Sequence, residues 1–299
     1  MLATLIDTFP SGLNAKRKIK ALQQRLPGDY HTVELDTCYI RYRMAGSGKH
    51  TLVLATDPPI SLECYDELIG ILAKDYRVIV FELPGFGYSL PKIGFDFRFD
   101  NTIEILIQLL KHWNCGPYVL SFPCAAAYFS IALAERFPQW VSHLALIQAP
   151  NWQQEQLWKH RLDPKSILNT PIMGQVFLKL GKRKVARQWV EYASNTPPFT
   201  QHSQALIDKQ LHHGGCYCLA SAMQKSLTPE SPALSGFTQP AIMVYGQQDS
   251  SHKKTDFETI RDYNPSIETC AIDKAGHFPE LETPQLFKNY LDKLIYASN

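Results

Sequence analysis

The stretch P-Y-V-L-S-F-P-C-A-A-A, residues 117–127, combines a strand pattern, a sharp turn and the start of a helix. Its first half is a short apolar run between Gly116-Pro117 and the turn, and its second half passes without a linker into small residues with a helical pattern. Such a turn lifts one side chain clear of a sheet and directs free helix N–H groups toward it. Cys124 stands at the turn, which predicts a nucleophilic thiol; the alternative is a small apolar side chain packed at a strand end.

Apolar segments of strand length alternate with helical patterns on both sides of this stretch. The predicted strands are Thr51 to Ala55, Arg77 to Glu82, Tyr118 to Phe122, His143 to Ile147, Ala241 to Tyr245 and Ile267 to Ile272. The predicted helices are Leu62 to Lys74, Arg98 to Trp113, Ala125 to Arg136, Thr255 to Tyr263 and Pro284 to Ala297. An antiparallel hairpin is predicted over His31 to Met44. The alternation predicts an α/β fold with a doubly wound, mostly parallel sheet covered on both faces.

The alternation is interrupted over residues 151–237, which contain helical patterns and no strand signal. These residues are predicted to form a helical lid, or cap, inserted before the strand that begins at Ala241. The α/β core is then built from residues 1–150 and 238–299. A basic amphipathic pattern over Asn14 to Leu26 predicts a peripheral helix within an N-terminal helical segment, residues 1–28.

The composition is that of an ordinary globular protein. Of 299 residues, 45% are hydrophobic, and 30 basic against 28 acidic side chains leave a net charge of +2, which gives no basis for binding nucleic acid or an anionic membrane. The chain shows neither a membrane span nor a signal peptide.

Seven scattered cysteines favour free thiols in a reducing compartment, so we expect a cytoplasmic protein. We expect no cofactor and no metal, because C-x-C at Cys216 and Cys218 fits no zinc spacing and no dinucleotide or phosphate motif is present.

Polar residues directly follow several of the predicted strands. Asp57 comes just after the first parallel strand, Cys124 after the third, Asp249 after the strand that follows the insertion, and His277 after the last. The carboxyl ends of parallel strands meet at one edge of a sheet. A thiol, a carboxylate and an imidazole are therefore expected together, in the chain order nucleophile, acid, base.

Several segments resemble motifs of the α/β-hydrolase fold superfamily. E-L-P-G-F-G-Y-S at residues 82–89 resembles its D-x-P-G-F-G-x-S turn, V-Y-G-Q-Q-D at residues 244–249 its acid loop, and A-G-H-F-P-E-L-E-T-P at residues 275–284 its histidine loop. F-P-C-A-A at residues 122–126 takes the place of the G-x-S-x-G elbow. Pro138, 14 residues after Cys124, matches a proline that members carry at the end of the elbow helix. The resemblance extends from about His31 to the C-terminus.

The resemblance implies a triad of Cys124, His277 and Asp249. His277 would accept the thiol proton or hold a thiolate whose pKa it lowers, and Asp249 would orient the ring. The backbone N–H groups of Ala125 and Asp57 would form the oxyanion hole. The start of the predicted lid, which includes Trp152 and Trp158, is expected directly above the elbow, so we expect a small apolar or aromatic substrate. The side chains expected to bind it are Phe122, Trp152 and Phe278.

Three departures separate the chain from ordinary members. Ala55-Thr56 replaces a His-Gly pair before the oxyanion loop, Asp57 puts a carboxylate there, and Phe122 replaces a glycine. Phe122 and the T-D-P-P-I-S loop resemble the haloalkane dehalogenase and epoxide hydrolase branch, whose nucleophile is aspartate. A cysteine in such chemistry would form a thioether that water cannot cleave. Two hypotheses remain: a cysteine hydrolase of esters, thioesters or lactones, with acyl transfer as a variant, or a non-hydrolytic member that binds a ligand or acts as a lyase or cyclase.

Overall fold

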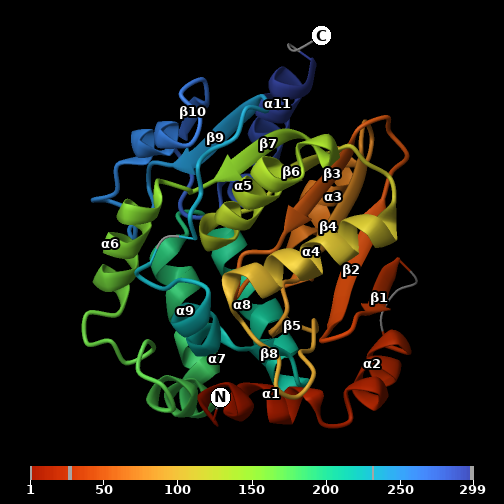
Figure 1. Cartoon of the computed structure of the whole chain (residues 1–299), viewed down its shortest axis with the longest axis vertical. Coiled ribbons are helices and arrows are strands. Elements are labelled where there is room, and N and C mark those ends of the chain that lie inside the picture. The colour runs from red at the N-terminus through yellow and green to blue at the C-terminus, as the bar shows by residue number, and fades with distance from the viewer. Residues whose placement is uncertain (1, 26–28, 231, 297–299) are drawn as a thin grey trace.

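An eight-stranded sheet forms the centre of the chain (Figure 1). The computed structural model describes residues 2–25, 29–230 and 232–296. The strands are β1 (Tyr30–Glu34), β2 (Tyr39–Ala45), β3 (Thr51–Ala55), β4 (Arg77–Phe81), β6 (Tyr118–Ser121), β7 (Val141–Ile147), β9 (Ala241–Gly246) and β10 (Glu268–Ile272). Their order is β1-β2-β4-β3-β6-β7-β9-β10, antiparallel at β1/β2 and β2/β4 and parallel elsewhere. The predicted mostly parallel, doubly wound sheet is therefore confirmed.

Helices cover both faces of this sheet. On one face α4 (Phe99–Trp113) packs beside α5 (Ala127–Arg136), and on the other α3 (Asp66–Leu72) packs beside α11 (Pro284–Tyr296) (Figure 1). The helix predicted over Leu62 to Lys74 begins as a 3-10 turn, η1 (Leu62–Tyr65). The helix predicted over Thr255 to Tyr263 is a 3-10 helix, η4 (Phe257–Asp262), which cannot lengthen because Asn264 precedes a proline.

The helical segment between β7 and β9 also contains a short strand. Its elements are α6 (Trp152–Leu162), α7 (Met173–Ala193), α8 (Pro197–His212), β8 (Cys216–Tyr217) and α9 (Leu219–Lys225). β8 pairs antiparallel with β5 (Phe86–Gly87), so the expectation of no strand within residues 151–237 is wrong. Two residues are too few for any periodicity to show, and the pairing depends on a contact between distant parts of the chain. We refer to these elements as the α6–α9 segment.

The N-terminal part of the chain packs against the α6–α9 segment. It contains α1 (Leu2–Gly12) and α2 (Ala15–Gln23), where the sequence predicts one helix from Asn14 to Leu26; the predicted end lies outside the described residues. α1 contacts α7 and α9, and the Ser221 hydroxyl donates to Asp7 Oδ2 at 2.6 Å. Because Asp7 is buried in this contact, α1 supports the α6–α9 segment.

The E-L-P-G-F-G-Y-S turn is held by a buried ion pair. A Cβ at Gly87, where φ is +57°, would lie 2.1 Å from the Glu82 carboxyl group, so the turn needs glycine. Glu82 Oε2 accepts a hydrogen bond from the Tyr88 N–H at 2.7 Å. The fully buried Arg41 guanidinium lies 3.3 Å from Glu82 and 2.6 Å from Glu63. The turn is thereby fixed beside the edge of the sheet where the candidate site lies.

None of the helices in the described part of the chain has the length and apolar character needed to cross a bilayer.

Candidate active site

Cys124 occupies a strained turn between β6 and the following helix. It is the first residue of the 3-10 turn η2 (Cys124–Ala126), which leads directly into α5, and its φ is +50°. A residue with a Cβ in this region costs about 1 kcal/mol or more, and such strain persists where the surrounding structure imposes it, often at functional sites. Pro123 is fixed by a parallel bridge to Ile147 of β7, and small alanines follow Cys124. The thiol is thus held at the carboxyl end of β6.

His277 lies in the loop after β10 and is held from two sides. Its backbone N–H donates to the Ala193 carbonyl at the end of α7 at 2.9 Å. Its Nδ1 donates to Asp249 Oδ2 at 2.6 Å, in the loop after β9. Because Asp249 holds Nδ1, the other ring nitrogen, Nε2, faces the site.

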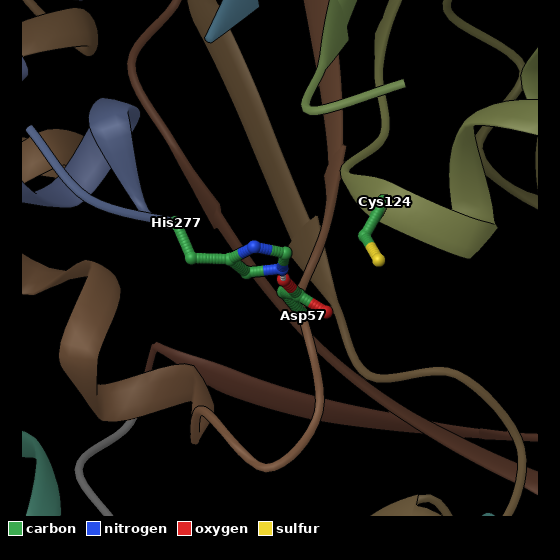
Figure 2. A group of neighbouring side chains, drawn as sticks. All are labelled: Asp57, Cys124 and His277. Carbon is green, nitrogen blue, oxygen red and sulfur yellow. Dashed lines mark ion pairs between the residues drawn. The ribbon is translucent and has the colours of Figure 1, made fainter. Parts of the chain in front are cut away.

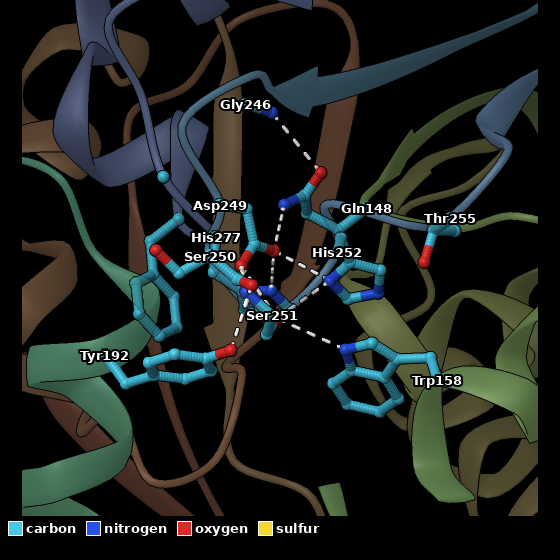
Figure 3. Close-up of polar contacts among 12 residues, drawn as sticks. Gln148, Trp158, Tyr192, Gly246, Asp249, Ser250, Ser251, His252, Thr255 and His277 are labelled. Atoms are coloured by element: carbon cyan, nitrogen blue, oxygen red, sulfur yellow. Dashed lines mark hydrogen bonds and ion pairs between the residues drawn. The ribbon is translucent and has the colours of Figure 1, made fainter. Parts of the chain in front are cut away.

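The Asp249 carboxylate is surrounded by donors (Figure 3). Oδ2 also accepts from Gln148 Nε2 and from His252 Nδ1, both at 2.7 Å, while Oδ1 accepts from the Ser251 N–H and hydroxyl, both at 2.7 Å. Burial alone would raise the pKa of Asp249, but the charge of His277 and these hydrogen bonds outweigh it and hold the pKa well below its usual range. Asp249 is therefore a fixed anion behind the His277 ring.

His252 is a second histidine at the site that sequence reasoning missed. Its ring is stacked on His277 at 5.1 Å and on Trp158 at 4.7 Å between centroids. Burial lowers the pKa of His252 to about 4 against the pull of Asp249, so the ring is neutral at neutral pH. Its position in the acid loop, three residues after Asp249, could have indicated that His252 lies at the site. The neutral ring acts as a hydrogen-bond donor that helps to fix the acid.

The Asp57 side chain points at His277 and does not turn away from the site (Figure 2). Its Oδ2 lies 3.1 Å from His277 Nε2, but the angle does not allow a hydrogen bond, and neither atom has another hydrogen-bond partner among the described residues. Burial lowers the pKa of His277, but Asp249, and after it Asp57 and Cys124, outweigh burial and raise the pKa well above its usual value. The ring is therefore cationic at rest, between two carboxylates.

The Cys124 thiol is neutral at rest. Burial raises its pKa to about 12, the charges of Glu155 and Asp57 add to this effect, and the opposing influence of His277 is smaller. The sequence predicts a thiol pKa lowered by His277, and the net direction of the shift is the opposite. The prediction fails because the thiol is buried in the folded chain, and this burial, to which Glu155 and Asp57 add, outweighs the influence of His277.

Two further buried carboxyl groups lie near the triad and were not found from the sequence. Glu155, in the first turn of α6, is fully buried, and neither carboxyl oxygen has a hydrogen-bond partner among the described residues; burial raises its pKa to about 8. Glu280, three residues after His277, accepts from the Tyr65 hydroxyl at 3.3 Å, and burial raises its pKa to about 8. An acidic residue at a helix start is common, so the position of Glu155 gave no signal.

A cavity of about 690 Å³ opens over Cys124. Asp57, Ala125 and His277 share its floor with Cys124. The rest of the lining is mostly apolar and aromatic, including Phe86, Phe97, Phe129, Trp158, Phe177, Trp189, Tyr217, Leu219 and Met223. The cavity therefore suits an apolar group, and the Ala125 and Asp57 amides border it.

The three side chains expected to bind substrate are not part of this lining. Phe122 packs on Phe81 at 5.5 Å, Trp152 on Tyr128 at 4.9 Å, and Phe278 on Phe199 at 5.6 Å between centroids. Phe122 and Phe278 lie within two residues of Cys124 and His277, and Trp152 begins the α6–α9 segment. All three side chains are nevertheless buried against other residues outside the cavity. Trp158 and Trp189 contact the His277 ring instead.

Comparison with known proteins identifies the family. Residues 58–284, more than half of the chain, match the model of the alpha/beta hydrolase fold family, and the chain belongs to that family. The hydrolase YugF of Bacillus subtilis, itself uncharacterized, is 22% identical over 261 residues, which cover 83% of this chain and 90% of YugF.

Solved structures share the fold at low sequence identity. ALR0039 of Nostoc sp. PCC 7120 superposes with a TM-score of 0.75 at 15% identity over 90% of this chain and 98% of its own. The Cif epoxide hydrolase from Acinetobacter nosocomialis superposes with a TM-score of 0.63 at 15% identity over 95% of this chain and 97% of its own. At this identity the likeness concerns the fold alone.

Proposed function

We propose that the protein hydrolyses a carboxylic ester, thioester or lactone with an apolar acyl group, using Cys124 as the nucleophile and no cofactor. The observation that carries the proposal is the position of Cys124 on a positive-φ elbow at the floor of an apolar cavity. His277 lies beside the thiol, and Asp249 is fixed behind the ring at 2.6 Å. This arrangement supplies a nucleophile, a proton carrier and an orienting anion.

Because His277 is cationic and Cys124 is neutral at rest, attack requires two proton movements. A rotation of the Asp57 carboxyl group first aligns it with Nε2, 3.1 Å away; the Nε2 proton then passes to this carboxylate, and the freed Nε2 takes the thiol proton as Sγ attacks the acyl carbon. The oxyanion forms against the N–H groups of Ala125 and Asp57. Asp57 is then neutral, so it does not repel the charge beside its own amide.

The remaining steps return the protons. Nε2 gives its proton to the leaving alcohol or thiol as the bond to the acyl carbon breaks, which leaves a thioester on Cys124. Nε2 then takes a proton from water, whose oxygen attacks the thioester. Nε2 gives this proton to the departing Cys124 sulfur as the acid is released, and Asp57 returns its proton to Nε2, which restores the neutral thiol and the cationic ring. In the acyl-transfer variant, an alcohol, amine or thiol takes the place of water.

The α6–α9 segment is the proposed lid, corresponding to the predicted cap over residues 151–237. It contributes Trp158, Phe177 and Trp189 to the cavity, all of them aromatic. An apolar or aromatic acyl group would bury its surface against these side chains, while the ester carbon lies near Cys124. The seven cysteines are free thiols, which suits the cytoplasmic location expected from their spacing.

A second candidate is a non-hydrolytic protein that binds an apolar ligand in the same cavity. The observation that favours it is the contact between Asp57 and His277, since the carboxylate faces the nitrogen that a base needs free. In that case ligand would raise the melting temperature, while no ester would turn over.

A panel of p-nitrophenyl esters of increasing acyl length tests the proposal. We expect turnover by the wild type, loss of at least about a thousandfold in Cys124→Ala, and a smaller loss in Cys124→Ser, which retains a nucleophile. Cys115→Ala is the matched control, because Cys115 is a partly buried free thiol before the amino end of β6. Full activity of Cys124→Ala contradicts the proposal, and the absence of all turnover together with ligand stabilisation supports the second candidate.

A further inference from the structure

Three side chains with metal-binding atoms lie close together (Figure 2), and all three line the cavity. Asp57 comes from the loop after β3, Cys124 from the elbow after β6 and His277 from the loop after β10. One ligand atom from each lies within 4.8 Å of the others, and all three residues are buried. A carboxylate oxygen, a thiol sulfur and an imidazole nitrogen therefore surround one point.

Two of these atoms have no hydrogen-bond partner, although they lie side by side. Asp57 Oδ2 and His277 Nε2 are 3.1 Å apart without hydrogen-bond alignment, on side chains that are 9% and 0% exposed. Two ligands bound to one tetrahedral zinc ion, each about 2.0–2.1 Å from it, lie about 3.3 Å from each other. The spacing is therefore close to that of two ligands of a common ion, and the lack of hydrogen-bond alignment leaves both atoms available to bind one.

The surroundings of His277 also match those of a metal ligand. Metal-bound histidines usually donate their other ring N–H to a carboxylate, which fixes the tautomer. His277 Nδ1 donates to Asp249 at 2.6 Å, and Asp249 is itself fixed by Gln148, Ser251 and His252. A second group, Asp249, His252 and His277, is less suitable, because the oxygens of Asp249 and Nδ1 of His277 are already engaged in these hydrogen bonds.

We propose that Asp57, Cys124 and His277 bind one zinc ion, with the fourth position open to the cavity. A thiolate, an imidazole and a carboxylate form a donor set that suits Zn²⁺. Binding forms bonds from zinc to Sγ, Nε2 and a carboxylate oxygen, and the thiol proton and the Nε2 proton are released to solvent. If Cys124 is the nucleophile of the proposed function, zinc inhibits hydrolysis reversibly, because zinc-bound Cys124 cannot attack an acyl carbon.

Cobalt provides a spectroscopic probe that does not depend on turnover. Metal-free full-length protein titrated with Co²⁺ should develop a thiolate-to-cobalt charge-transfer band that saturates at one ion per chain and disappears when Zn²⁺ is added. Cys124→Ser should lose the band, and Asp57→Asn should weaken zinc binding by at least about tenfold. Cys115→Ala should bind as the wild type does. An unchanged band in Cys124→Ser, or no band in the folded wild type, overturns the zinc site.

Ester turnover by the same samples separates this inference from the proposed function. Turnover that falls on adding Zn²⁺ and returns with a chelator supports the zinc site and its consequence. Turnover that rises with Zn²⁺ overturns the inhibitory role. Cobalt binding in a protein that hydrolyses no ester supports the metal site, while the proposed function alone fails.

Discussion

Replacing Asp57 with asparagine should make the Cys124 thiol more acidic and more reactive. Asparagine keeps the shape of the side chain and the backbone N–H but removes the negative charge. That charge contributes to a thiol pKa of about 12, together with burial and Glu155. His277 remains cationic in the variant, because Asp249 is the larger cause of its raised pKa. The variant thus leaves a cation beside the thiol and removes a nearby anion.

The size of the effect follows from the separation of the groups. Asp57 and Cys124 ligand atoms lie within 4.8 Å, so a thiolate and a carboxylate repel each other by about 1 kcal/mol at the dielectric of water and about 3 kcal/mol at an effective value of 20. Removing the carboxylate charge therefore lowers the thiol pKa by about 1 to 2. The thiolate fraction rises about tenfold for each unit, but its intrinsic nucleophilicity falls about threefold. Alkylation at a fixed pH near neutrality should be about three- to tenfold faster.

The assay is the rate of iodoacetamide labelling of the Cys124 peptide, followed by mass spectrometry at several pH values. Asp36→Asn is the matched control, because Asp36 is exposed in the turn between β1 and β2, and its labelling rate should equal that of the wild type. A rate in Asp57→Asn that is unchanged or slower would refute the electrostatic account of the thiol.

Three further predictions address the acid, the buried carboxyl group and the ion pair. Asp249→Asn should lower kcat for ester hydrolysis by about four orders of magnitude, because the amide no longer fixes the His277 tautomer; near-wild-type kcat would contradict the triad. The folded-state pKa of Glu155, about 8, lies above its ordinary 4.5, so the folded chain keeps a proton that the unfolded chain has lost, and the free energy of unfolding falls as the pH rises through this window. Urea unfolding of Glu155→Gln should show a weaker pH dependence than the wild type, and an identical dependence would contradict the burial argument. Arg41→Ala should lower the free energy of unfolding by about 3 to 5 kcal/mol, since it leaves the buried Glu82 carboxyl group, 3.3 Å away, without its partner; a loss below about 1 kcal/mol would count against a structural ion pair.

The parts of the site that follow strands could be predicted from the sequence. β3, β6, β7 and β9 are buried apolar runs, and their ends locate Asp57, Cys124 and Asp249 at one edge of the sheet. The two-residue strand β8 was missed, because it is too short to show a period. Helix α1 lies within the predicted N-terminal helical segment, residues 1–28, but its contacts with α7 and α9 join distant parts of the chain and could not be predicted.

The electrostatics of the site could not be predicted, because they depend on side-chain direction. Nothing in T-D-P-P indicates that the Asp57 carboxylate faces His277 at 3.1 Å, and nothing in the first turn of α6 indicates that Glu155 is fully buried. Burial of the thiol, with smaller contributions from Glu155 and Asp57, reverses the expected direction of the Cys124 pKa shift. The direction of the Phe122 side chain could not be predicted either. We expected Phe122, two residues before Cys124, to contact the substrate, but its ring packs on Phe81.

Trapping the acyl-enzyme tests the central claim most directly. Wild-type protein mixed with a slowly hydrolysed p-nitrophenyl ester and quenched in acid should gain the mass of one acyl group, and peptide mapping should place this group on Cys124 as a thioester. Cys115→Ala should be labelled like the wild type, and Cys124→Ala should remain unmodified while losing turnover. An acyl group on another residue, or ester turnover that persists in Cys124→Ala, would contradict the assignment of Cys124 as the nucleophile.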